Sequence, residues 1–329
     1  MQRREFITLI SSAAGIWPIH ALAQPGERVR RIGILWRGDV TEGVVQAQQG
    51  AFQAEIANLG WIEGRNVGFD VRYSADDPNR IRAHADELVG LGPDVIVASS
   101  FPVAKAVLQR TQTIPVIFVN VADPVAGGFL KSTTRPEGNA TGITSNYQSM
   151  GAKWLELLKE FAPSTARAAL IFAAQNVNDQ FFGVINDAAK QLAVKAVPMP
   201  YSNAAELERA IDDFAGEQDN GALLMVPPPP SPTHGGLINR LALKHRLPTI
   251  YSSKFYVAQG GLMSYGAPIV ESYRTAARYV DRILRGTQIS ELPVQFPSRL
   301  ELAINVKTAN AIGLTLSRLS LTRADELIE

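Results

Sequence analysis

Short apolar runs alternate with longer amphipathic stretches along most of this chain. Within residues 94–128, two apolar runs, DVIVAS and PVIFVNV, flank a segment with helical spacing that opens at Phe101-Pro102. An earlier apolar run, RIGILW at 31–36, precedes a helical stripe through Val45, Phe52 and Ile56 that stops at Gly60. This alternation predicts a doubly wound α/β lobe with a parallel sheet. Its expected strands are 31–36, 66–73, 94–99 and 115–121, and its expected helices are 45–59, 78–89 and 102–109.

A short strand at 140–144 follows a polar loop, and the same alternation then starts again. Its predicted strands are 168–173, 194–199, 221–226 and 248–251, and its predicted helices are 154–161, 181–192, 206–214 and 235–245. The two halves share no visible sequence identity, so the repeat is one of architecture. The repeated alternation predicts a second Rossmann-like lobe.

A glycine-flanked strand at 260–266, a long amphipathic helix ending at Arg285-Gly286 and a strand at 300–306 remain after the second lobe. We expect the chain to cross between lobes three times, near 141–143, 251–253 and 292–297. The expected lobes are 28–142 plus 252–291 for lobe one, and 143–251 plus 292–329 for lobe two. Such a three-crossing hinge leaves a cleft between lobes.

Residues 1–23 have the pattern of an export signal. A basic start at Arg3-Arg4 precedes a short apolar run, and Ala21-Leu22-Ala23 resembles a cleavage site. The pattern Arg3-Arg4-Glu5-Phe6-Ile7 resembles a twin-arginine signal, and the alternative is a frayed cytosolic N-terminus. We expect cleavage after Ala23 and a soluble periplasmic protein without a lipid anchor, because the chain has no Cys.

Charge and composition limit the classes of partner that the protein is expected to bind. Residues 1–23 contain two Arg and one Glu, so their removal leaves 30 basic and 30 acidic residues. A neutral chain without a basic block argues against nucleic acid or an anionic membrane as a partner. Hydrophobic residues make up 46% of the chain, enough for two packed cores, and no disulfide contributes to stability.

Common catalytic and cofactor motifs do not occur. There is no G-x-G-x-x-G or G-x-x-x-x-G-K-[ST] motif, and Ser264 lies in G-x-x-S-x-G rather than in a nucleophile elbow. The histidines after residue 23 are His84, His234 and His245, and none has another His or Cys at ligand spacing. We therefore expect a non-enzymatic protein without a metal or cofactor.

Polar residues at the strand ends are the candidate ligand contacts. Ser99 and Ser100, before Phe101-Pro102, either cap the next helix or bind a ligand carboxylate with its free N–H groups. Asp123 either fixes a turn before Pro124 or accepts a hydrogen bond from a ligand ammonium or hydroxyl group. Asn120 is a polar residue at the end of an apolar strand and favours a ligand role.

Other candidates have an equally plain structural alternative. Trp36 either stacks on a planar ligand or packs in the core, and Tyr265 faces either the cleft or the interior. The prolines 227–230 suggest a rigid apolar wall. The full predicted ligand-binding set is Trp36, Ser99, Ser100, Phe101, Asn120, Asp123, Thr144, Asn176, Pro227, Ser252 and Tyr265.

Several motifs together resemble the ABC transporter substrate-binding protein family of the type I periplasmic-binding fold, including its tryptophan-binding-like branch. They are Arg3-Arg4-Glu5-Phe6-Ile7, Leu59-Gly60-Trp61-Ile62-Glu63-Gly64-Arg65-Asn66-Val67, Asp94-Val95-Ile96-Val97, Asp123-Pro124-Val125, Gly260-Gly261-Leu262-Met263-Ser264-Tyr265-Gly266, Ala277-Arg278-Tyr279-Val280-Asp281-Arg282-Ile283-Leu284-Arg285-Gly286, Leu302-Ala303-Ile304-Asn305 and Ala324-Asp325-Glu326-Leu327-Ile328-Glu329. The resemblance implies a small-molecule solute held by the strand-end loops of both lobes and delivery to permease subunits in the inner membrane.

Other functions remain open from the sequence. One is an exported enzyme that uses the same cleft, and another is the ligand-sensing component of a membrane receptor. We expect a monomer that captures an amino-acid-like or aromatic, carboxylated solute by hinge closure.

Overall fold

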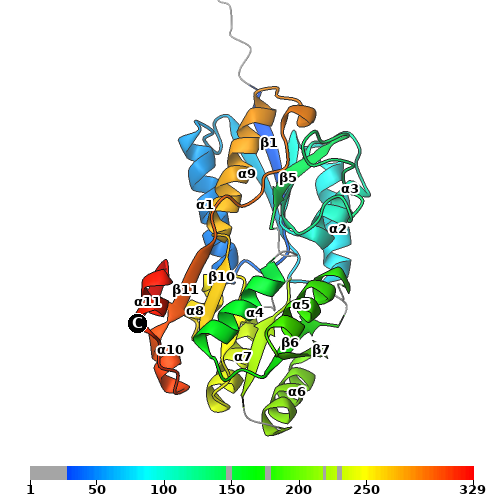
Figure 1. The fold of residues 1–329 in the computed structure, drawn as a ribbon. Coiled ribbons are helices and arrows are strands. Elements are labelled where there is room, and N and C mark those ends of the chain that lie inside the picture. Colours follow the sequence, from blue (N-terminus) through cyan, green and yellow to red (C-terminus); the bar gives the residue numbers. More distant parts are fainter. Residues whose placement is uncertain (1–27, 146–149, 175–178, 218–219, 228–231) are drawn as a thin grey trace, which may run out of the picture.

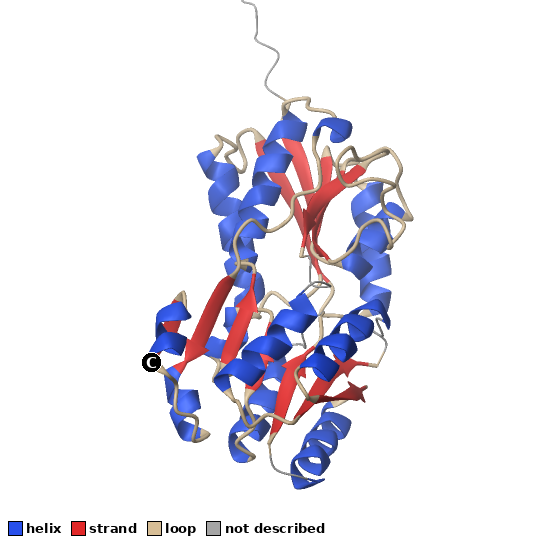
Figure 2. Cartoon of the chain, in the orientation of Figure 1, coloured by secondary structure: helices blue, strands red, loops and turns tan. Residues whose placement is uncertain are grey.

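The computed structural model describes residues 28–145, 150–174, 179–217, 220–227 and 232–329. They form two α/β lobes, one above the other in Figure 1, with helices on both faces of each sheet in Figure 2. The predicted fold class, two Rossmann-like lobes with parallel sheets, is confirmed. The predicted site residue Asn176 lies outside the described residues.

Lobe one contains a five-stranded parallel sheet in the order β2-β1-β3-β4-β5. Its strands are β1 (Arg30–Trp36), β2 (Val67–Tyr73), β3 (Val95–Ala98), β4 (Val116–Val121) and β5 (Ala140–Thr144). One face packs against α1 (Gly43–Asn58) and α9 (Ile269–Leu284), and the other packs against α2 (Pro78–Gly90) and α3 (Phe101–Leu108). Strands buried on both faces explain the near-continuous apolar runs in the sequence.

Lobe two contains a seven-stranded sheet in the order β12-β11-β10-β9-β8-β6-β7. The pairing is parallel except between β10 and β11. The strands are β6 (Arg167–Ala173), β7 (Lys195–Tyr201), β8 (Gly221–Met225), β9 (Thr249–Tyr251), β10 (Met263–Gly266), β11 (Glu301–Asn305) and β12 (Glu326–Ile328). Pro198 and Pro200 fall in β7, an edge strand, where a missing backbone donor is tolerated.

The helices of lobe two also divide between the two faces of its sheet. One core includes α4 (Met150–Phe161), α5 (Asp179–Gln191) and α10 (Val306–Ala311), and the other includes α6 (Ala204–Glu217), α7 (Pro232–Lys244) and α8 (Lys254–Ala258). A 3-10 turn (Ile289–Glu291) follows α9, and α11 (Arg318–Arg323) precedes β12.

The strand pairing differs from the expected lobe boundary at residue 252. β10 pairs with β9 and β11, so residues 252–266 belong to the sheet of lobe two. The chain returns to lobe one between Gly266 and Ile269, where α9 begins, and not near 251–253. The local sequence pattern does not show which sheet β10 joins. A helix follows β10 in the chain, as it follows other strands of both lobes.

The other two crossings lie side by side. Gln295 donates its backbone N–H to the Gly142 carbonyl at 2.9 Å, and the Thr144 N–H donates to the Gln295 carbonyl at 2.9 Å. Val294 also bonds back to lobe one, through Thr133. The final crossing therefore follows Gln295 and leads to β11, and both connections start from the β5 edge of lobe one.

Candidate functional site

The carboxyl ends of the lobe-one strands form the edge that faces lobe two. Trp36 ends β1, Ser99 and Ser100 follow β3, and Asn120 lies in β4. The register places Leu35 of β1 beside Ala98 of β3, so these residues come to the same edge. Ligands of open α/β sheets bind at such an edge, which is the location that the sequence predicts.

Ser99 and Ser100 have different environments although both are buried. The Arg37 N–H donates to Ser99 Oγ at 2.7 Å, which ties the ends of β1 and β3 together. Ser100 is the N-cap residue of α3, but its side chain makes no capping hydrogen bond and its Oγ has no partner among the described residues. The Ser100 hydroxyl therefore does not cap the helix, which was the structural alternative to ligand binding.

Trp36 is buried, with a side chain that is 1% exposed. Its ring packs on Tyr273 of α9, with centroids 4.9 Å apart and planes tilted by 37°. Its indole Nε1 has no hydrogen-bond partner among the described residues. The ring thus packs in the core of lobe one, as the structural alternative to ligand stacking supposes.

The segment after β4 carries Asn120 and Asp123. Asn120 has φ +59, in the left-handed region, at a register shift between β4 and β5. A non-glycine residue in this conformation is uncommon and is often found at functional sites. Asp123 Oδ1 accepts hydrogen bonds from the N–H groups of Val125 at 3.0 Å and Ala126 at 2.9 Å, so it does serve the turn.

Phe101 and Thr144 also lie at this edge. The Phe101 ring is 37% exposed and stacks on Phe129, with centroids 4.9 Å apart. Thr144 is buried and its Oγ1 donates to the Ala122 carbonyl at 3.0 Å. Both side chains therefore hold the segment that carries Asn120 and Asp123.

The predicted residues of lobe two are less closely grouped. Pro227 follows β8 and is half-buried, while residues 228–230 of the proline run lie outside the described residues. Ser252 follows β9, is buried, and lines a hollow with a volume of about 880 Å³ beside the hinge crossings. Tyr265 of β10 packs partly against the core under α4, and its carbonyl accepts from Trp154 Nε1 at 2.6 Å.

Four residues outside the predicted ligand set interact electrostatically between the lobes. In lobe one, Arg37 and Asp76 form an ion pair. In lobe two, Tyr201 and His234 make an edge-to-face contact with ring centroids 5.1 Å apart. Burial raises the pKa of Tyr201 to about 12, and the charges of Arg37 and Asp76 also act on it. Charges of lobe one therefore act on lobe two at this side of the cleft.

The loop that carries Asp76 is held in an unusual conformation. Ala75 and Asp76 both have positive φ, at +47 and +61. The Asp76 N–H donates to the Arg37 carbonyl at 2.8 Å, and Ser74 Oγ donates to the same carbonyl at 2.7 Å. Burial lowers the pKa of His234, and the Asp76 carboxylate acts on it in the opposite direction.

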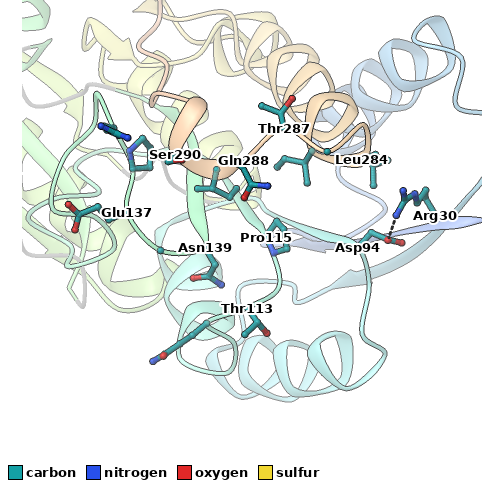
Figure 3. A pocket seen from close by; sticks show the side chains of 17 residues that line it. Arg30, Asp94, Thr113, Pro115, Glu137, Asn139, Leu284, Thr287, Gln288 and Ser290 are labelled. Atoms are coloured by element: carbon teal, nitrogen blue, oxygen red, sulfur yellow. Dashed lines mark hydrogen bonds and ion pairs between the residues drawn. The ribbon is translucent and has the colours of Figure 1, made fainter.

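A second hollow lies at the opposite, amino-terminal edge of the lobe-one sheet (Figure 3). Its volume is about 750 Å³, and it is bounded by the starts of β1 and β4 and by the residues after α9. Arg30 Nη1 pairs with Asp94 Oδ1 at 2.9 Å in its wall. It contains no residue of the predicted ligand set, so we do not assign the site to it.

Within the described ranges, no group of three or more His, Asp or Glu side chains is arranged to hold a metal ion. None of the helices in the part of the chain that the structure describes is both long and apolar enough to span a bilayer.

Comparisons with known proteins agree on one family. A family model described as "ABC transporter substrate binding protein" matches residues 40–328. The chain is 28% identical over 286 residues to a protein of Clostridioides difficile (strain R20291) called "Tyrosine-binding protein", covering 85% of this chain and 81% of that one.

Two solved structures share the fold. A conserved domain protein from Vibrio cholerae superposes with a TM-score of 0.83 at 24% identity, covering 91% of this chain and 100% of that chain. An ABC domain from Streptococcus pneumonia, solved in complex with L-Trp, also has a TM-score of 0.83, at 20% identity, covering 91% and 99%.

Proposed function

The chain belongs to the ABC transporter substrate-binding protein family, and from this we propose that it captures an amino-acid-like solute between its lobes for an importer. Its fold is that of the type I periplasmic binding proteins. The observation that supports the proposal best is the position of the polar strand-end residues. They lie at the edge of lobe one that faces lobe two across three short connections.

Binding by closure follows from this geometry. A solute that touches both lobes has more contacts in the closed state than in the open one, so it shifts the population towards closure. The charges of Arg37 and Asp76 act on Tyr201 and His234 of the other lobe, which gives closure an electrostatic interaction that does not involve the solute. The hinge is the set of connections that start at β5, leave β10 and follow Gln295.

We infer an aromatic amino acid as the solute class. The support is the curated relative called "Tyrosine-binding protein" and the related fold solved with L-Trp. In lobe one, Ser100 Oγ has no hydrogen-bond partner among the described residues, and Asp123 Oδ1 is engaged in its turn. Micromolar affinity corresponds to roughly −8 kcal/mol, which a few charge-assisted hydrogen bonds and one buried apolar contact supply.

The cellular setting forms part of the proposal. An exported, monomeric protein without enzymatic activity would carry the solute to permease subunits in the inner membrane. The support is the family and the export-like residues 1–23.

The test is a binding measurement on protein freed of co-purified solute by reversible unfolding. We expect L-tyrosine or L-tryptophan to bind with micromolar affinity in calorimetry, with L-lysine as the negative control. Small-angle scattering should show a more compact particle with the bound amino acid. Absence of binding by both aromatic amino acids would refute the solute class, and conversion of either one to product would refute the non-enzymatic role.

A further inference from the structure

Three buried polar atoms at the cleft edge of lobe one have no hydrogen-bond partner among the described residues. They are Trp36 Nε1, Ser100 Oγ and Ser145 Oγ. Their side chains belong to residues that are 1%, 7% and 6% exposed. They stand at the ends of β1, β3 and β5. Buried polar groups are nearly always paired, so three unpaired ones along one sheet edge need a physical reason.

The other tryptophans in the described part of the chain show the contrast. Trp61 Nε1 donates to Asp281 Oδ1 at 2.8 Å, and Trp154 Nε1 donates to the Tyr265 carbonyl at 2.6 Å. Neighbouring serines are paired too, because Ser99 Oγ accepts from Arg37 and Ser74 Oγ donates to Arg37. The edge therefore contains both satisfied and unsatisfied groups, and only the latter have hydrogen-bonding capacity left for a solute.

We propose that Trp36 binds the solute as a hydrogen-bond donor and not as a stacking surface, with Ser100 and Ser145 as two further contacts. This inference rests on the proposed function, because it concerns the same cleft. The Trp36 ring packs on Tyr273, while the indole nitrogen remains unpaired. An indole N–H can only donate, so the solute must place an oxygen acceptor at the end of β1.

The spacing of the three groups defines the solute further. β1 and β5 are separated by β3 and β4, which makes three steps of about 4.8 Å each between neighbouring strands. One small group cannot reach all three positions across about 14 Å of sheet. An elongated solute with polar groups at both ends, a carboxylate and a hydroxyl for example, matches this row better than a solute with one polar group.

The direct test observes the indole N–H by nuclear magnetic resonance of protein labelled with ¹⁵N at tryptophan. The chain has four tryptophans, so Trp17→Phe, Trp61→Phe and Trp154→Phe assign the signals and leave the fourth to Trp36. In the free protein, we expect the Trp36 Nε1–H signal upfield of the signals from the two paired indoles. Addition of L-tyrosine should move it downfield and slow its exchange with solvent, while the other two move little. A Trp36 signal that already has the position of a paired indole, or that ignores bound tyrosine, would overturn the inference.

A second test uses the two serines, because their replacement by alanine removes only one oxygen atom from the side chain. Ser100→Ala and Ser145→Ala should leave the melting temperature of the free protein unchanged or raise it, because each removes an unpaired buried hydroxyl. Ser74→Ala is the matched control and should lower it, because that hydroxyl is paired. Both cleft variants should weaken L-tyrosine binding by about 2- to 10-fold. Unchanged affinity in both, or a fall in melting temperature like that of Ser74→Ala, would contradict the proposal.

The two tests separate this inference from the proposed solute class. If neither L-tyrosine nor L-tryptophan binds, the solute class fails. The free-protein indole signal and the melting temperatures still decide whether the three groups are unpaired. If they are unpaired, the row of contacts stands for another elongated solute, and if they are paired, the inference fails too.

Discussion

The backbone N–H of Arg37 donates a hydrogen bond to Ser99 Oγ at 2.7 Å, across two neighbouring parallel strands. This bond uses a side chain to continue the β1–β3 pairing by one step beyond the last backbone contact. It also fixes the point from which Ser100 and α3 begin.

We expect Ser99→Ala to destabilise the protein by about 1–3 kcal/mol, because it leaves the buried Arg37 N–H without an acceptor. Urea unfolding followed by circular dichroism measures the change. Ser100→Ala is the natural control, since its hydroxyl has no such bond. Equal stability of the two variants would mean that the Arg37–Ser99 bond has no structural weight.

Asp123→Asn should separate the two roles of Asp123. Its amide oxygen can still accept from Val125 and Ala126, so the free energy of unfolding should change by less than about 0.5 kcal/mol. Loss of the Asp123 charge should weaken the binding of L-tyrosine more than the binding of 3-(4-hydroxyphenyl)propionate, which lacks the amine. Calorimetry measures both affinities. Equal losses for both compounds would leave Asp123 with the turn role alone.

Asp76→Asn tests the electrostatic interaction between the lobes. Asparagine tolerates the left-handed conformation at this position, so folding should be preserved. Removing the charge that faces Tyr201 and His234 should weaken L-tyrosine binding about 1.5- to 5-fold through a less favourable closed state. Asp77→Asn, at the N-cap of α2, is the neighbouring control for a general effect of charge. The Asp76 charge has no role in closure if Asp76→Asn binds tyrosine like the unmodified protein.

Glu87 predicts a pH dependence of stability. A hydrogen bond from Arg72 lowers the pKa of Glu87 from 4.5 to about 2. The folded state therefore favours the carboxylate, and its contribution is present above about pH 4.5 and is lost as the pH falls towards 2. Thermal unfolding of Glu87→Gln should show a deficit against the unmodified protein at pH 6 that shrinks by pH 2.5. A constant deficit over this range would exclude the linkage.

Much of the fold is visible in the sequence because both sheets are built from local units. Hydrophobic periodicity and the residues that end each segment are enough to predict the strands β1, β3 and β4 and the helix α1. The expected boundary at residue 252 differs from the pairing of β10, because pairing between distant strands is not a local property. The helix α8 and the strand β12 are too short, at five and three residues, to show a period.

The residues of the candidate site were also only partly predictable from the sequence. The strand-end rule predicts Ser99, Ser100 and Asn120, because topology alone brings them to one edge. The packing of Trp36 depends on Tyr273, which arrives from a helix far along the chain. Ser145 had a signal that went unused, since it directly follows the last strand of lobe one. Asp76 pairs with Arg37 of its own lobe, but its charge also acts on Tyr201 and His234 of the other lobe, which the local sequence does not show.

The return of α9 to lobe one has a consequence for biogenesis. Val45, Phe52 and Ile56 of α1 are buried in the core that α9 completes, and Trp61 and Arg285 join the two segments further. More than 200 residues of intervening chain must leave the ribosome before this core can close. A nascent chain truncated before Ile269 should therefore stay protease-sensitive in lobe one.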